Sequence, residues 1–313
     1  MEETPNLDLP RSSDAARTIR ALLGAAGSPI FAVLDGGQFD DLPGLLGEED
    51  IECRSLFREG GDADHRLAGP WLVPASDVLT QSYVERLDAK APCAVYWLCP
   101  AGEDRLWRHL RTLNEVLIPR EESAHQGKAT AGAGYERVLF RHWDPNVLAP
   151  VLPILTRPQF SRFLGPARRV VFNAPDYGGV KRVGAADDLP PAPPGPLRFE
   201  PEQMDRLKAA MLHASRLRIA RFLKGHVPPH FSGVNDDFVW GATLASEKSA
   251  DELGIRTERG RARWATVMVV SDGKAAEMPE VRDYVRGGNP DERVKSLIGH
   301  AVDALRSGAA AAS

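Results

Sequence analysis

Three histidines and one aspartate are close enough in sequence to suggest a hydrolytic or metal-binding site: His109, His125, His142 and Asp144. His142 and Asp144 flank a single residue at the end of an expected strand, a spacing that directs both side chains to one face. Neither a Gly-x-Ser-x-Gly elbow nor a His-Glu-x-x-His helix accompanies them, however. We therefore expect a protein that is not an enzyme, and keep a hydrolase that uses His109, His142 and Asp144 as an alternative.

Asp35 follows an apolar run, a position at which α/β enzymes often carry a catalytic carboxylate. The next two residues are Gly36 and Gly37, and a carboxylate before such a turn commonly accepts hydrogen bonds from backbone N–H groups. We therefore expect a structural role for Asp35.

The remaining residue types that could bind a metal or cofactor show no suitable pattern. Cys53, Cys93 and Cys99 have neither a Cys-x-x-Cys nor a Cys/His spacing, so we expect free, mostly buried thiols in a reducing compartment. No Gly-Lys-Ser/Thr segment occurs in the context of a phosphate-binding loop. The sequence predicts neither a metal nor a cofactor.

Composition sets the broad class of the protein. The 313 residues are 43% hydrophobic and 26% charged, which is enough to bury one large core or two smaller ones. The net charge of -4 arises from mixed acidic and basic residues, a pattern that favours neither nucleic acid nor an anionic membrane as a partner. Residues 1–20 lack a secretory signal, and the apolar runs are far below the ~20 residues that span a bilayer. We expect a cytoplasmic protein with no stable membrane insertion.

The pattern of apolar residues predicts an α/β N-terminal lobe over residues 28–175, with a mixed sheet and helices, after an N-terminal extension over residues 1–27. The expected strands are residues 30–34, 53–57, 71–73, 94–98, 138–140 and 169–172. Residues 103–117 show apolar spacings of three and four, which predict a helix. Asp144 as N-cap and Pro145 at the first helical position predict the start of another.

The second half of the chain changes character. Residues 176–198 contain Gly178, Gly179 and five prolines, which indicates an extended linker; a long loop inside one domain is the alternative. An all-α C-terminal lobe is expected over residues 199–307, with residues 308–313 as a frayed tail. Its helices are expected at residues 200–225 and after Asn235, Thr257 and Asn289, with Trp264 and Met268 facing inward.

Five segments in the first half occur in a characteristic order: residues 30–35, 55–57, 69–73, 106–110 and 138–148. Their motif residues are Asp35, Ser55, Leu56, Phe57, Gly69, Pro70, Asp144 and Pro145. Together, over residues 28–172, they resemble the uncharacterised-domain family whose members serve as effector adaptors of bacterial type VI secretion systems. A looser similarity continues in the second half with Gly254, Ile255 and Glu258, where Leu253 replaces the aromatic residue of the family.

The resemblance implies an adaptor chaperone. Such a protein binds a toxic effector through its N-terminal or delivery region and places it on the valine-glycine-repeat spike protein or its tip, and it is not secreted itself. This function needs a surface that hides apolar peptide and later releases it. A toxin-neutralising immunity protein is an alternative and would bind the active domain of the effector instead.

The expected helix at residues 103–117 carries arginines beside its apolar stripe, and these could meet acidic groups or carbonyls of the effector; a solvated helix face is the alternative. We assign effector contacts to six residues on this helix and just after the expected strand at residues 138–140: Arg105, Arg108, His109, Arg111, Arg141 and Trp143.

Overall fold

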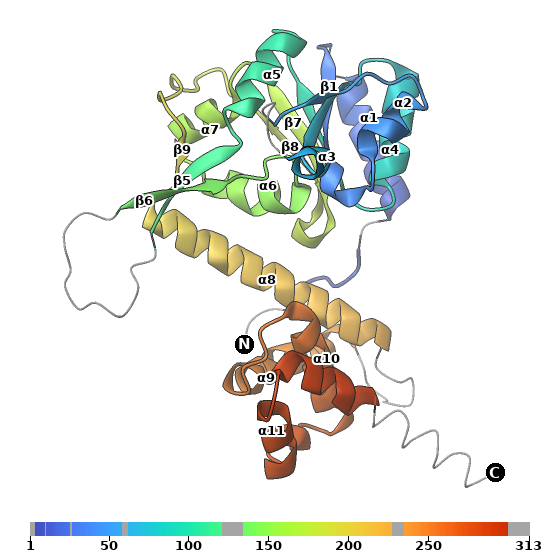
Figure 1. Cartoon of the computed structure of the whole chain (residues 1–313), viewed down its shortest axis with the longest axis vertical. Helices are drawn as coiled ribbons and strands as arrows, with labels where there is room; N and C mark the ends of the chain where they lie inside the picture. Colours follow the sequence, from blue (N-terminus) through green and yellow to red (C-terminus); the bar gives the residue numbers. More distant parts are fainter. Residues whose placement is uncertain are drawn as a thin grey trace. The chain divides into compact units, whose positions relative to one another are not determined.

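A computed structural model describes residues 4–9, 11–25, 27–57, 62–120, 134–226 and 235–299. His125 and the predicted tail lie outside these residues. The chain divides into two compact units, of which one comprises Leu9–Ala210 and the other Met1–Asp8 with Met211–Ser313. We call them the α/β unit and the helical unit (Figure 1). The predicted fold class, an α/β first half followed by a helical second half, is confirmed.

The α/β unit is built on a six-stranded sheet with the order β2-β3-β1-β4-β7-β8. Its strands are β1 (Ile30–Asp35), β2 (Arg54–Ser55), β3 (Pro70–Pro74), β4 (Ala94–Leu98), β7 (Arg169–Ala174) and β8 (Gly179–Gly184). All neighbouring strands are antiparallel. The central strands β1 and β4 are buried at every position, which explains why they read as continuous apolar runs.

Helices cover both faces of this sheet (Figure 1). The side chains of β1 alternate between the two faces and therefore belong to two hydrophobic cores. Ala32 and Leu34 pack with α1 (Ser12–Gly24), α2 (Leu42–Gly47) and α4 (Val78–Asp88). Phe31 and Val33 belong to the core that includes side chains of three other helices. These are α5 (Glu103–Arg111), α6 (Pro145–Val151) and α7 (Arg157–Leu164). The short helix α3 (Ala63–Leu67) precedes β3.

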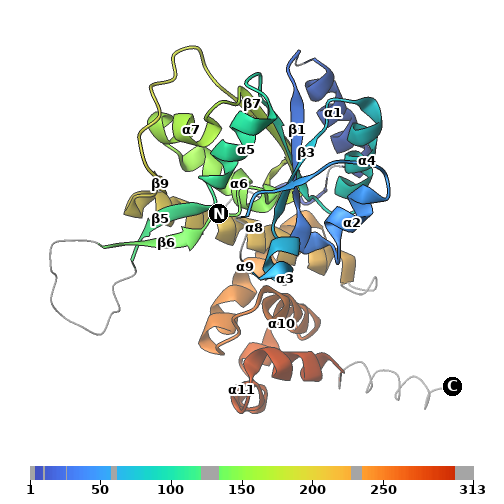
Figure 2. The same cartoon turned by 45° about the horizontal axis from the view of Figure 1, so that its top comes forward.

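A second, three-stranded sheet has the order β6-β5-β9 (Figure 2). Strand β5 (Glu115–Pro119) pairs antiparallel with β6 (Tyr135–Leu139) and parallel with β9 (Leu197–Arg198). The prediction of one helix over residues 103–117 is therefore wrong in its second part. The helix ends where the Thr112 hydroxyl donates to the His109 carbonyl at 2.6 Å, and the apolar residues that follow belong to a strand.

Two predicted boundaries differ from the structure. The predicted extension over residues 1–27 contains α1, whose Ile19 and Leu23 are buried against the sheet. The predicted linker over residues 176–198 contains β8, because Gly178 and Gly179 have positive φ angles and allow the turn from β7 into β8.

The proline-rich stretch that follows β8 is held along α7. Ser161 donates a hydrogen bond to the Pro190 carbonyl at 2.6 Å, and Arg162 donates one to the Gly195 carbonyl at 2.8 Å. The boundary between the units falls later, within α8 (Pro201–His226), between Ala210 and Met211.

The helical unit contains the second part of α8, then α9 (Asp236–Glu252), α10 (Glu258–Val270), α11 (Pro279–Arg286) and a helical stretch over residues 290–299. The predicted starts after Asn235, Thr257 and Asn289 are confirmed, since each side chain accepts a hydrogen bond from a backbone N–H of its helix. Trp264 is fully buried and Met268 packs against the same core. None of the helices in the described ranges has the length and apolar character needed to cross a membrane.

Asp144 is expected to stabilise the folded protein as the N-cap of α6. Its carboxylate caps α6 by accepting the N–H of Asn146 at 2.9 Å and lies 3.4 Å from Arg141. We expect Asp144→Ala to lower the free energy of unfolding by about 1 kcal/mol, because the cap is lost, and Asp144→Asn to lower it less. Urea unfolding measures both. An Asp144→Ala protein of unchanged stability that fails to bind its partner would contradict this assignment.

Candidate functional site

Segments that are distant in sequence meet around Asp35, a residue with only 2% of its surface exposed. One carboxylate oxygen accepts hydrogen bonds from the Gly37 N–H and the Trp143 indole N–H, each at 3.2 Å. The other accepts a hydrogen bond from Arg141 at 2.7 Å. Asp35 therefore accepts a backbone hydrogen bond at the turn that follows β1, and its carboxylate also ties the end of β1 to the segment that leads into α6.

Asn114 makes a second connection of this kind. Its amide nitrogen donates to the Leu56 carbonyl at 2.9 Å, and its amide oxygen lies 3.1 Å from Nε2 of His142. The Leu56 N–H in turn donates to the Pro70 carbonyl at 2.9 Å. These contacts bring motif segments of the first half together. We use the name strand-end junction for five residues that make them: Asp35, Leu56, Asn114, Arg141 and Trp143.

Gly69 and Phe57 complete the packing beside the strand-end junction. A Cβ atom on Gly69 would lie 2.6 Å from the Phe57 ring, so a larger residue would displace that ring. Phe57 meets Trp143 edge to face, with 5.6 Å between the ring centroids. The strand-end junction thereby supports a ring that is only partly buried and is available at the surface.

Phe57 lies at the meeting point of two pockets of about 720 and 750 Å³ that also share Arg111. We call the combined feature the arginine groove. Its first pocket is lined by Arg54, Ser55, Arg66, Trp71 and Trp107, and its second mainly by Arg137, Leu139, Arg162 and residues 193–196. Volumes of this size are in the range of ligand-binding pockets.

Trp107 forms a rigid wall of the first pocket. The guanidinium carbons of Arg54 and Arg111 lie 4.3 and 4.2 Å from the centre of its ring, which is cation–π distance. The indole N–H donates to the Ser55 carbonyl at 3.0 Å. Arg54 is also paired with Glu103 and Asp104 at 3.1 and 2.9 Å, so its charge is balanced within the protein.

Three other arginines of the groove make no ion pair with a carboxylate in the described part of the chain: Arg66, Arg111 and Arg162. Nε of Arg111 is buried and has no hydrogen-bond partner among the described residues. Arg162 bonds only neutral acceptors, the Gly195 carbonyl and the carbonyl and hydroxyl of Thr112, and burial lowers its pKa below the ordinary value. The groove therefore concentrates positive charge on a chain of net charge -4.

Two of the residues considered for catalysis, His109 and His142, line neither pocket of the groove. His142 is fully buried, and Nε2 of His109 lies 2.9 Å from the Phe163 carbonyl. Burial lowers the pKa of His109 to about 4 and that of His142 to about 3, so both rings are neutral at pH 7. In the described ranges, no hydrogen bond joins these histidines to each other or to Asp144, and no cluster of potential metal ligands occurs.

His109 predicts a measurable pH dependence. Its pKa is about 4 in the folded protein but near 6.5 in the unfolded chain, so the unfolded chain binds more protons between these values. Stability is therefore lost as the pH falls below 6.5. Between pH 7.5 and pH 5, we expect wild type to lose about 2 kcal/mol more unfolding free energy than His109→Gln, as measured by urea unfolding. The same pH dependence in both proteins would contradict the buried, neutral state.

The six residues assigned to effector contact lie in different environments. Arg111 is part of the groove, but Arg105 and Arg108 are exposed on α5 and line neither pocket. Trp143 has 2% of its surface exposed, so it serves the strand-end junction and presents no surface to a partner.

His109 and Arg141 also contribute to packing. His109 is largely buried beside Gly165, where a Cβ atom would lie 2.3 Å from its ring. Arg141 is about half exposed, but its guanidinium is bound to Asp35. Sequence reasoning missed Arg54, Arg66 and Arg162, which come from separate segments without a common periodicity and are brought together only by the tertiary fold.

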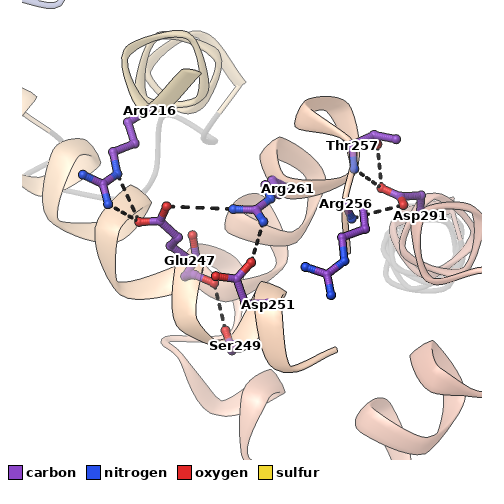
Figure 3. Close-up of polar contacts among 9 residues, drawn as sticks. Arg216, Glu247, Ser249, Asp251, Arg256, Thr257, Arg261 and Asp291 are labelled. Atoms are coloured by element: carbon purple, nitrogen blue, oxygen red, sulfur yellow. Dashed lines mark hydrogen bonds and ion pairs between the residues drawn. The ribbon is translucent and has the colours of Figure 1, made fainter. Parts of the chain in front are cut away.

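The motif of the second half also has a structural role. Gly254 ends α9 with a positive φ angle, Ile255 is fully buried, and Glu258 pairs with Arg218 at 2.7 Å. Asp291 accepts hydrogen bonds from the backbone N–H groups of Arg256 and Thr257 (Figure 3). These contacts connect the start of α10 to neighbouring helices within the helical unit.

Figure 3 also shows a polar network in the same unit, in which Glu247 lies between Arg216 of α8 and Arg261 of α10. Arg261 is further paired with Asp251, the next acidic residue along α9. The network joins three helices, so substitutions here test the stability of the helical unit and not the groove.

Comparison with known proteins gives one match. Residues 30–162 match the model of a family described as "Domain of unknown function (DUF4123)". No curated protein and no solved structure matches the chain. The matched segment runs from β1 into α7 and includes the whole strand-end junction. It also includes Arg111 and Arg162, the two arginines of the second pocket that pair with no carboxylate among the described residues.

Proposed function

We propose that this protein is an adaptor chaperone of a type VI secretion system. It binds a toxic effector through the effector's delivery region and hands it to the spike protein or its tip, and it remains in the cytoplasm. Two findings support this proposal. The DUF4123 match over residues 30–162 coincides with most of the segment on which the resemblance to the adaptor family rests, and the same segment carries a large surface groove.

The arginine groove is the observation that carries the proposal. Arginine and aromatic side chains are enriched where protein partners bind most tightly, and this groove combines Arg111 and Arg162 with Phe57 and Trp107. The aromatic rings can cover apolar side chains of an effector, while charged contacts at the surface allow its release. The strand-end junction holds Phe57 in place, which lowers the entropy lost on binding.

The composition of the groove supports binding over catalysis. Among the described residues that line it, there is no histidine and no cysteine, and its one carboxylate, Glu115, is paired with Arg137 at 3.1 Å. Hydrolytic sites commonly use a free carboxylate or histidine as general base for water or a side-chain nucleophile, and the only such group of the described lining, Glu115, is held in an ion pair. We therefore propose an effector-binding role and not an enzymatic one.

Co-expression with each protein encoded by the adjacent genes, including any toxin among them, tests the proposed function. We expect a stable complex on size-exclusion chromatography that forms with the delivery region of the toxin alone. The isolated active domain should remain outside the complex and retain its toxicity. A complex that requires the active domain and neutralises it would support the immunity alternative, and the absence of any complex would contradict the adaptor proposal.

A further inference from the structure

The charge distribution of the arginine groove points to the chemistry of its occupant. Arg54 and Arg137 have carboxylate partners within the protein, whereas Arg66, Arg111 and Arg162 have none among the described residues. Arg66 is exposed to water, whereas Arg111 and Arg162 are partly buried. Charges that are partly removed from water are costly unless an opposite charge compensates them. The groove is therefore complementary to a ligand that brings negative charge to these arginines.

Arg111 has the geometry to receive a carboxylate. Its guanidinium stacks on the Trp107 ring at 4.2 Å, an arrangement that uses the face of the planar group and leaves its edge of N–H donors free. Nε is buried without a hydrogen-bond partner in the described part of the chain, so a ligand reaches this group through its two terminal nitrogens. A carboxylate can accept two parallel hydrogen bonds from these nitrogens, which a single neutral acceptor cannot do.

Arg162 provides a second position for negative charge. The Gly195 carbonyl and the Thr112 hydroxyl orient its guanidinium at 2.8 and 2.9 Å, so the side chain is held in place before any ligand binds. These acceptors are neutral and leave the positive charge uncompensated. Arg111 and Arg162 line the same pocket, so one ligand segment can reach both.

Apolar side chains lie between these charges. Leu139 has 58% of its surface exposed, and Phe57 lines both pockets. Pro193, Pro194 and Pro196 form part of the rim of the second pocket. A ligand that carried only negative charge would leave this apolar surface uncovered, whereas a peptide with both acidic and aromatic residues would cover it.

We infer that the arginine groove binds an acidic, extended peptide segment of the effector, with carboxylates against Arg111 and Arg162 and an aromatic or aliphatic side chain against Phe57. The inference rests on the proposed function for the identity of the partner. A nucleic acid fits less well, because Glu103 and Asp104 flank Arg54 and the chain as a whole is acidic.

Fluorescence anisotropy with three labelled probes tests the inference on the full chain. The first is a ten-residue peptide of aspartate and glutamate with a central tryptophan, the second is the same peptide with asparagine and glutamine, and the third is a ten-nucleotide oligothymidylate. We expect the acidic peptide to bind at least tenfold more tightly than both others, with an affinity that falls as salt is added.

Arg111→Gln and Arg162→Gln should each weaken binding of the acidic peptide about tenfold or more, while Arg105→Gln, which removes the same charge from an exposed position on α5, should leave it unchanged. Circular dichroism checks that each variant is folded. Equal affinity for the acidic and amide peptides, or full binding by both groove variants, would overturn the inference. Equally tight binding of the oligonucleotide would overturn it in favour of a general polyanion site.

The outcomes separate this inference from the proposed function. If the effector still forms a complex with the Arg111→Gln and Arg162→Gln variants and the acidic peptide does not bind, the inference is wrong and the adaptor proposal stands. If the peptide binds as expected but no effector forms a complex with wild type, the inference about ligand chemistry stands and the adaptor proposal is wrong.

Discussion

Asp35→Ala is expected to lower the free energy of unfolding by about 3 kcal/mol, because the N–H donors of Gly37, Gln38, Arg141 and Trp143 lose one buried acceptor. The Trp143 indole N–H is the most costly of these, since Trp143 has 2% of its surface exposed and water cannot replace the carboxylate. Arg141 is about half exposed and can be hydrated again, which keeps the loss below that of a fully buried ion pair.

Urea unfolding followed by tryptophan fluorescence measures this effect. Asp35→Asn keeps the shape and one acceptor oxygen, so it should lose less stability than Asp35→Ala. Asp41→Ala serves as a control, because Asp41 is an exposed N-cap that accepts the Gly44 N–H at 3.0 Å. Its loss should be about 1 kcal/mol. Equal losses for Asp35→Ala and Asp41→Ala would contradict the role of Asp35 in the strand-end junction.

Charge reversal at Arg111 and Arg162 together is expected to weaken effector binding by about 30-fold or more. Removing one partner of a desolvated charge pair costs about 2–5 kcal/mol, and reversal adds repulsion; each 1.4 kcal/mol corresponds to about a tenfold change in affinity. The measurement is the affinity of the Arg111→Glu, Arg162→Glu double variant for the effector's delivery region, by isothermal titration calorimetry.

The matched control is Arg105→Glu with Arg108→Glu. This double variant changes the net charge by the same amount, but both side chains are exposed on α5 and line neither pocket. We expect wild-type affinity from it, apart from a small loss at low salt. If the control weakens binding as much as the groove variant does, the effector recognises the exposed face of α5, as the sequence alone suggested.

Local signals made much of the fold predictable. The helix starts at Asp144, Asn235, Thr257 and Asn289 follow from side chains that cap a backbone N–H, and such contacts depend on residues only two or three positions apart. The central strands were equally clear, because a strand buried on both faces must be apolar throughout.

The mistakes arose where tertiary contacts decide the structure. Leu113 and Leu117 continue the apolar spacing of α5, but Leu117 lies in β5, because pairing with β6 and β9 outweighs a weak helical preference. Gly178 and Gly179 suit either a linker or a tight turn, and the partner strand β7 makes them a turn.

The candidate site was likewise predictable only where local sequence decides the structure. The sequence identified Asp35 and Phe57 as motif residues and Arg111 as a surface cation. It could not show that Asp35 binds Arg141, 106 positions later, or that Phe57 and Arg111 line one groove with Arg162. Contacts of this kind leave no periodic pattern in a single sequence.

Secretion in a bacterium that carries this gene is the most direct test of the adaptor proposal. Deleting the gene should stop release of the effector that binds this protein into the medium, while a second effector of the same machine is still released. The wild-type gene should restore release, the Arg111→Glu, Arg162→Glu variant should not, and the protein itself should remain in the cells. Normal release of the effector from the deletion strain would contradict the proposal.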